Sequence, residues 1–152
     1  MEALYRGDRT RAEELALGAH LDIHEAASLG RADRIRELLA SDEALVSARS
    51  GDGFTPLHYA AFFGTAEVAA ALLEHGADPA AVAENDMRVQ PLHSAAAVDA
   101  NETARLLLDA GADPNARQEG GFRPIDAAFH NGNEELYDLL AERGAELPAP
   151  AE

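Results

Sequence analysis

The chain has 152 residues, of which 47% are hydrophobic, and this size and apolar content predict one folded unit with a buried core. It carries 28 acidic and 12 basic residues, every basic one an arginine, for a formal charge of −16, which disfavours phosphate backbones and so excludes bare nucleic acid as an expected partner. No cysteine is present, which excludes disulfides, cysteine-ligated zinc and a thiol nucleophile.

The first 21 residues are charged throughout and contain no apolar run long enough for a signal peptide or a membrane span. Residues 8–19 predict a short helix with Ala12, Leu15 and Ala16 on one face, which we interpret as an N-terminal capping helix within residues 1–21. By default we expect a cytoplasmic protein. The absence of lysine beside abundant alanine and arginine is typical of a GC-rich bacterial genome.

Residues 22–51 follow with two short helical patterns, "DIHEAASLG" and "RIRELLASD". His20 and His24 are spaced i, i+4 with Glu25 adjacent, which is a weak metal-binding pattern if one helix holds both. The segment "GAHLD" favours a helix junction there instead. We therefore expect no metal site, because such sites need three or four converging ligands.

The rest of the chain repeats. "TPLHYAAFFG", "QPLHSAAAVD" and "RPIDAAFHNG" align with one another, and a glycine closes each unit. The prolines and the closing glycines share the same spacings of 35 and 33 residues, at Pro56, Pro91 and Pro124 and at Gly76, Gly111 and Gly144. A fixed period of this length predicts a stacked repeat architecture.

Each unit predicts two antiparallel helices and an extended finger. Thr55 is a suitable helix cap, with Pro56 in the first turn, where its missing N–H costs nothing. The second helix carries leucine pairs on its inner side, and Gly76 suits a left-handed stop. The small pair Ala60 and Ala61 lets neighbouring first helices approach closely. A single unit cannot bury its own apolar face, so stacking is required.

With these motifs, "GFTPLHYAAFFGTAEVAAALLEHGADP" resembles an ankyrin repeat, a family marked by a 33-residue period and the T-P-L-H-x-A signature. The resemblance covers roughly residues 22–145 and implies an all-α ankyrin-repeat solenoid of about four repeats plus the N-terminal capping helix. The expected units are a degenerate repeat at 22–51, repeats at 52–84 and 85–117, a polar C-terminal capping repeat at 118–146 and a disordered tail at 147–152. The third unit departs from the family pattern at Arg88, Gln90 and Asp99, and the fourth at Asp126.

His58 and His93 are the tempting catalytic residues, because each follows Pro-Leu and lies near carboxylates. The resemblance implies another role, since this imidazole in ankyrin repeats bonds to neighbouring backbone and ties one unit to the next. Other catalytic motifs, including a phosphate loop and G-x-S-x-G, are absent. We therefore predict no enzyme, no cofactor and no metal.

The family uses finger tips and first helices as a recognition surface. Carried over to this chain, the partner-binding residues would be Asp52, Phe54, Tyr59, Phe62, Phe63, Asp86, Met87, Arg88, Val89, Ser94, Glu119, Phe122 and His130. Two readings of Phe62 and Phe63 stay open: neighbouring units bury them, or at least one is exposed, because adjacent helix residues point about 100° apart. The 35-residue interval also predicts a longer finger within residues 80–89.

The function that the resemblance implies is a non-catalytic scaffold that binds another protein through its concave face, with no nucleic acid or membrane partner and as a monomer. The expected partner presents a basic or apolar patch. Two alternatives from other classes stay open. One is an enzyme or small-molecule sensor with a site around His58 and His93, and the other is a structural protein that self-associates through the aromatic patch.

Overall fold

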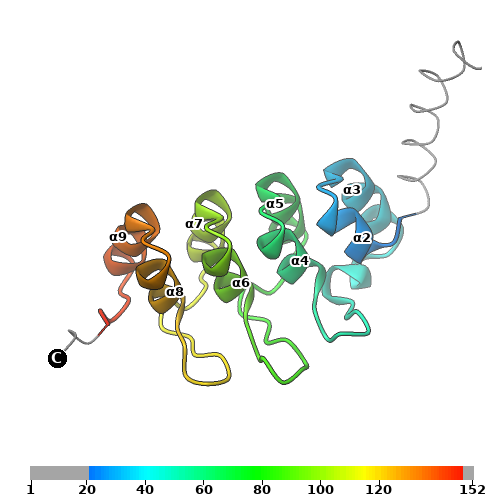
Figure 1. The fold of residues 1–152 in the computed structure, drawn as a ribbon. Helices are drawn as coiled ribbons and strands as arrows, with labels where there is room; N and C mark the ends of the chain where they lie inside the picture. The colour runs from blue at the N-terminus through cyan, green and yellow to red at the C-terminus, as the bar shows by residue number, and fades with distance from the viewer. Residues whose placement is uncertain (1–20, 149–152) are drawn as a thin grey trace, which may run out of the picture.

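The computed structural model describes residues 21–148, which form eight α-helices and one 3-10 helix, with no strand in that range. The eight helices form four helix-turn-helix pairs, which stand side by side in Figure 1 with the fingers projecting from one side of the stack. The all-α solenoid predicted from the repeats is confirmed. The predicted helix at residues 8–19 and the end of the tail, residues 149–152, lie outside the described residues.

The helices of each pair occupy two parallel rows. The inner row consists of the first helices, α2 (Ile23–Ser28), α4 (Pro56–Phe62), α6 (Pro91–Ala97) and α8 (Pro124–His130). The outer row consists of the second helices, α3 (Ala32–Ser41), α5 (Ala66–Glu74), α7 (Asn101–Asp109) and α9 (Glu134–Glu142). The 3-10 helix η1 (Glu43–Ser47) follows α3 and leads into the first finger.

Each row packs along its length, so that every inner helix contacts the next inner helix and every outer helix the next outer one. The inner contacts are close because Ala60, Ala61, Ala95 and Ala96 are fully buried between α4, α6 and their neighbours. Branched side chains fill the space between the rows, and the fully buried ones include Leu72, Leu107 and Leu140. The prediction that the alanine pairs let neighbouring first helices approach closely is therefore confirmed, and one unit lies directly on the next.

The fingers are short hairpins. In the first finger Ser50 N–H donates to the Phe54 carbonyl, and in the third Gln118 N–H donates to the Phe122 carbonyl, both at 2.9 Å. In the second finger the corresponding bond joins Ala83 N–H to the Val89 carbonyl at 2.8 Å, so this hairpin encloses two more residues. The prediction of a longer finger within residues 80–89 is thus confirmed.

Two departures from the family pattern are accommodated by the backbone. Arg88 and Asp99 occupy positions where the neighbouring repeats have glycine, and both adopt a positive φ, of 50° and 58°. The strain at Asp99 is offset locally, because its carboxylate accepts hydrogen bonds from the side-chain amides of Asn131 and Asn133, at 3.2 and 3.1 Å. These bonds join the third repeat to the fourth.

The third departure, Gln90, leaves a defect at the start of α6. In the second repeat the His58 N–H donates to Thr55 Oγ1, at 3.4 Å, which caps α4. Gln90 Oε1 is buried and has no hydrogen-bond partner within the described part of the chain. A shorter hydroxyl at this position would restore the cap.

We therefore expect Gln90→Thr to raise the free energy of unfolding by about 1 kcal/mol, the usual contribution of a helix cap. Urea titration of the full chain measures the change. The reciprocal variant Thr55→Gln is the matched control and should lower the stability by a similar amount. A Gln90→Thr protein that unfolds at a lower urea concentration than the parent would show that the glutamine side chain packs better than it bonds.

Candidate functional site

A groove lies in the angle between the fingers and the inner helices. One part of it is a hollow of about 390 Å³ between the first two fingers, over α4 and α6. Eight of the thirteen residues predicted to bind a partner line this hollow: Asp52, Phe54, Tyr59, Phe62, Phe63, Met87, Val89 and Ser94. The structure therefore brings residues from two fingers and two helices to one place.

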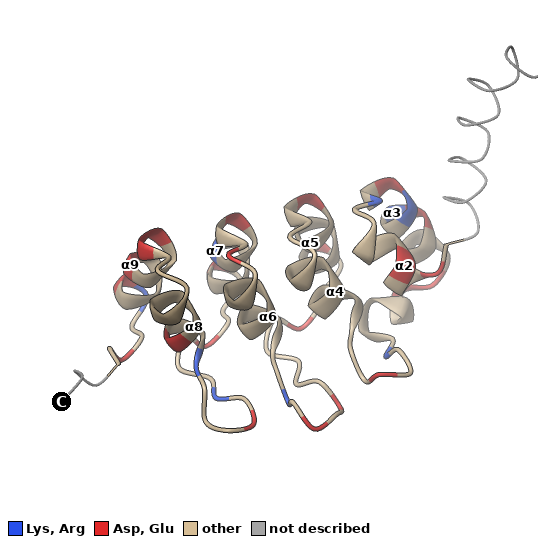
Figure 2. Ribbon diagram, in the orientation of Figure 1, with Lys and Arg blue, Asp and Glu red and all other residues tan. Residues whose placement is uncertain are grey.

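The hollow is apolar because of what α4 and α6 present to it. Neither helix has an Asp, Glu, Lys or Arg, and both are tan throughout in Figure 2, whereas acids gather on the outer helices and finger tips. Phe62 and Phe63 are 53% and 54% exposed, and their rings meet edge to face at 5.2 Å. Met87 on the second finger is 54% exposed. Of the two readings left open by the sequence, exposure holds for both phenylalanines.

Other residues of the predicted set are held beneath this surface. Val89 and Ser94 are buried, so they shape the hollow without offering much area to a partner. Tyr59 and Phe54 are half-buried and pack edge to face, with ring centroids 5.8 Å apart. The Tyr59 hydroxyl donates to Ser50 Oγ at 2.9 Å, which fixes the ring against the base of the first finger.

The groove continues into a second hollow, of about 810 Å³, between the third finger and the helices α6 and α8. Phe122 and His130, both predicted, line it and are exposed. The two hollows share His93, Ala97 and Gln118. The predicted set did not include Gln118. The signal that could have found it is its register, since Gln118 holds the same hairpin position in the third finger as Ser50 in the first.

The remaining predicted residues, Asp86, Arg88 and Glu119, lie on the finger tips together with Asp52. Asp52, Asp86 and Glu119 are exposed, one on each of three successive fingers, and their carboxylates form no ion pair with any residue in the range 21–148. Arg88 is also exposed, but it lines a different hollow, between η1 and residues 78–85. The structure thus does not bring Arg88 to the groove.

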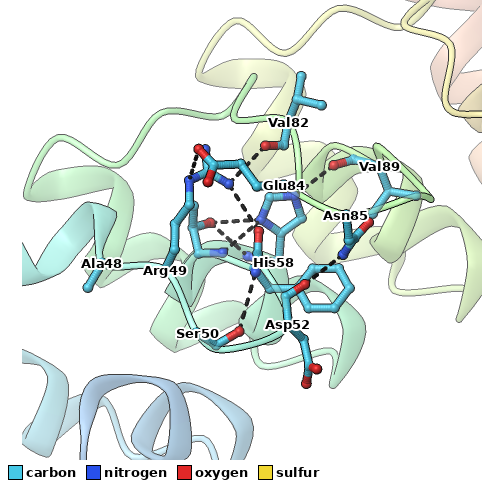
Figure 3. A network of polar contacts seen from close by, with 12 residues as sticks. Ala48, Arg49, Ser50, Asp52, His58, Val82, Glu84, Asn85 and Val89 are labelled. Carbon is cyan, nitrogen blue, oxygen red and sulfur yellow. Dashed lines mark hydrogen bonds and ion pairs between the residues drawn. The ribbon is translucent and has the colours of Figure 1, made fainter.

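His58 is a buried link between repeats, as Figure 3 shows. Its Nδ1 accepts a hydrogen bond from the Thr55 N–H at 3.2 Å, so its Nε2 carries the proton and donates to the Val89 carbonyl at 2.8 Å. Burial lowers the pKa of His58 to about 4, although the bond to Val89 opposes the shift. The imidazole is therefore neutral, with both nitrogens engaged.

The same link recurs in the neighbouring repeats. His93 Nδ1 accepts from Gln90 N–H at 2.9 Å, its Nε2 donates to the Ala116 carbonyl at 2.8 Å, and burial lowers its pKa. His24, considered above only as a metal ligand, bonds through Nε2 to the Ala48 carbonyl at 2.7 Å. Within residues 21–148 no group of three or more His, Cys, Asp or Glu side chains could hold a metal ion. His20 lies outside that range.

A second network joins the first finger to the second (Figure 3). Arg49 donates through Nη1 to the carbonyls of Gly53 and Val82, at 3.0 and 2.9 Å, and its Nε lies 3.1 Å from the Glu84 carboxylate. The Asn85 side chain donates to the Asp52 carbonyl at 2.9 Å. These contacts hold the two fingers that flank the first hollow at a fixed separation.

A stack of helix-turn-helix units with hairpin fingers and a groove along its inner helices defines a helical repeat solenoid. The family model for ankyrin repeats in three copies matches residues 1–83 and 23–118, and the chain belongs to this family. Ankyrin repeats are, in general, modules through which proteins bind other proteins. Within the described range no helix is long and apolar enough to cross a membrane.

Two human proteins are similar to this chain over about half of its length. One is the DNA-binding protein RFXANK, 42% identical over 81 residues, which cover 51% of this chain and 31% of that protein. The other is ankyrin repeat and SAM domain-containing protein 3, 32% identical over 74 residues, which cover 49% of this chain and 11% of that protein. The matched segment thus spans less than a third of either relative.

Proposed function

We propose that the chain is a non-catalytic binding module that holds a partner protein in the groove between the fingers and the inner helices. The observation that carries the proposal is the convergence of Phe62, Phe63 and Met87, each more than half exposed, on one apolar hollow. Exposed apolar groups gathered in one place on an acidic protein are costly to leave in water and mark interaction sites.

The proposed contact surface has a centre and a rim. Phe54, Tyr59, Phe62, Phe63 and Met87 form the centre, supported from below by the buried residues already described. The second hollow adds Phe122 and His130, and the finger-tip carboxylates Asp52, Asp86 and Glu119 lie around the rim, whereas Arg88 lies outside the proposed surface. Binding energy usually concentrates in a few aromatic anchors near the centre, while the rim contributes less.

The geometry of His58 and His93 argues against a catalytic role for either histidine and so favours a binding function for the chain. A general base needs an accessible nitrogen within hydrogen-bond reach of the substrate. Both imidazoles are buried, and both nitrogens of each ring already bond to the protein backbone. A site that used either histidine would first have to break a link between two repeats.

The partner we propose is a protein rather than DNA, although one relative is named as DNA-binding. A nucleic-acid surface neutralises phosphates with lysine or arginine. Here α4 and α6 carry no lysine or arginine, and the formal charge of the whole chain is −16. The field around the groove therefore opposes a phosphate backbone.

The test uses a partner protein isolated by affinity pull-down with the full chain. We expect Phe62→Ala and Phe54→Ala each to weaken its binding by about 2 kcal/mol or more, roughly thirtyfold in Kd. Met87→Glu should have a comparable effect, because it places a charge beside the apolar hollow. Isothermal titration calorimetry measures the affinity, after thermal unfolding has shown that each variant folds like the parent.

Phe129→Ala is the matched control, because Phe129 is 65% exposed on the last inner helix but lines neither hollow of the groove. Arg105→Ala adds a control on the outer row. Both should bind like the parent. Normal binding by the groove variants together with failure of Arg105→Ala would place the partner on the outer helices and reject the proposed surface.

A further inference from the structure

We infer that the groove selects a linear segment with one large apolar side chain flanked by lysine or arginine, an inference that rests on the proposed function. The apolar side chain would fill the hollow over α4 and α6, and the basic residues would face the carboxylates on the fingers. The shape of the groove and the distribution of charge around it support the two halves of this statement separately.

The first hollow has room for one large side chain. Its volume of about 390 Å³ lies near the lower end of the range for pockets that take small ligands. Phe54, Phe62 and Met87 line it, so its walls are aromatic rings and one flexible thioether, which adapts to apolar groups of different shape. One large aliphatic or aromatic residue suits this space.

The groove continues past this hollow at a step set by the repeat. Ala97 lies at the boundary of the two hollows and occupies the position in α6 that Phe62 occupies in α4, so the wall between them is low. Packed helices are about 8 to 10 Å apart, and an extended chain advances about 3.3 Å per residue. An extended segment would reach the second hollow about three residues after its apolar anchor.

The charge on the finger tips around the groove is negative, and the carboxylates that carry it are exposed to a partner. Asp52, Asp86 and Glu119 are exposed on successive fingers without an ion pair in the described range. Three arginines lie nearby: Arg49 pairs with Glu84, Arg117 Nη1 donates to the Gly121 carbonyl at 2.8 Å, and the exposed Arg88 lines the separate hollow between η1 and residues 78–85. Basic residues on either side of the anchor complement this rim and would raise the association rate.

The test begins with a library of random 16-residue peptides displayed on phage and selected on the full chain. We expect the enriched peptides to share one large apolar residue with lysine or arginine within about three residues on each side. The selected peptide and a version with every lysine and arginine replaced by glutamine are then titrated against three proteins. These are the parent, a finger variant (Asp52→Asn, Asp86→Asn and Glu119→Gln) and an outer-row variant (Glu74→Gln, Asp138→Asn and Glu142→Gln).

The two variants change the net charge equally, one at the finger tips and the other on the outer row. The finger variant should bind the basic peptide about tenfold more weakly at low salt, since three exposed ion pairs are each worth a few-fold. The outer-row variant should lose less than about twofold, and 0.5 M salt should remove the difference by screening. The glutamine peptide should bind all three proteins alike.

Enrichment of acidic or uncharged sequences, equal losses in the two variants, or no enrichment at all would each overturn the inference. A separate measurement distinguishes its failure from that of the proposed function. If Phe62→Ala weakens binding of the selected peptide but the finger variant does not, the groove is the binding site and only the inferred preference for basic flanking residues is wrong. If Phe62→Ala leaves the affinity for the selected peptide unchanged, the groove is not the binding site and the proposed function fails.

Discussion

Lowering the pH from 7.5 to 5 should reduce the free energy of unfolding by about 2 kcal/mol through His58 alone, with a further loss through His93. Burial lowers the pKa of His58 from 6.5 to about 4 in the folded protein, so below pH 6.5 the unfolded chain binds more protons. The stabilising contribution is therefore complete above pH 6.5 and is lost as the pH falls toward 4. Urea titrations at a series of pH values measure it.

The structural reason is that protonation places a charge in a buried site and turns the Nδ1 acceptor into a donor. In the neutral ring Nδ1 accepts from the Thr55 N–H, whereas a protonated Nδ1 would leave that buried N–H without its acceptor and would donate to Thr55 Oγ1, 2.8 Å away. Acidification thus weakens the hydrogen bonding at the start of α4, while the Nε2 bond to the Val89 carbonyl is kept. Most carboxylates are still ionised at pH 5. A loss of stability between pH 7.5 and 5 is therefore distinct from acid unfolding caused by carboxylate protonation.

Two variants isolate the contribution of the imidazole. His58→Gln should be less stable than the parent at pH 7.5, but its stability should fall less between pH 7.5 and 5. Leu57→Ala, a fully buried neighbour in α4, should lower stability at both pH values and keep the parental pH dependence. A His58→Gln protein with the full parental slope would mean that the loss arises elsewhere.

The fold was predictable because its determinants are local and periodic. Pro56, Pro91 and Pro124 mark the start of α4, α6 and α8, and the alanine pairs that follow are fully buried in the first two of these helices. Each of these features acts within one repeat or between adjacent repeats. A 33-residue period is therefore sufficient to place helices, turns and fingers, since every repeat meets the same neighbours.

The site was only partly predictable, because exposure depends on which neighbour is missing or small. Phe62 is exposed since the equivalent residue in the next repeat is Ala97, and the sequence of one repeat cannot show that. Val89 looks like an exposed finger residue, yet the carbonyl that His58 binds draws it under the finger. These outcomes depend on pairs of residues about 30 positions apart.

Gly53→Ala should cost about 3 kcal/mol or more of stability, whereas Gly121→Ala, at the equivalent position of the third finger, should cost about 1 kcal/mol. Both glycines have a positive φ, of 85° and 82°, so the conformational penalty is shared. The surroundings differ. A Cβ on Gly53 would lie 2.3 Å from the Glu84 carbonyl oxygen, while one on Gly121 would find only the end of the Arg117 side chain, at 3.8 Å.

The obstacle at Gly53 is backbone that cannot rotate away. Glu84 N–H donates to the Gly53 carbonyl at 2.9 Å, so the first two fingers touch at this point and a side chain would force them apart. Asp52 and Phe54 flank Gly53 and line the first hollow, so separating the fingers would also widen the groove. Gly53→Ala should therefore lower the affinity for the selected peptide more than Gly121→Ala does. Equal losses of stability in the two variants would show that the contact between the fingers yields without cost.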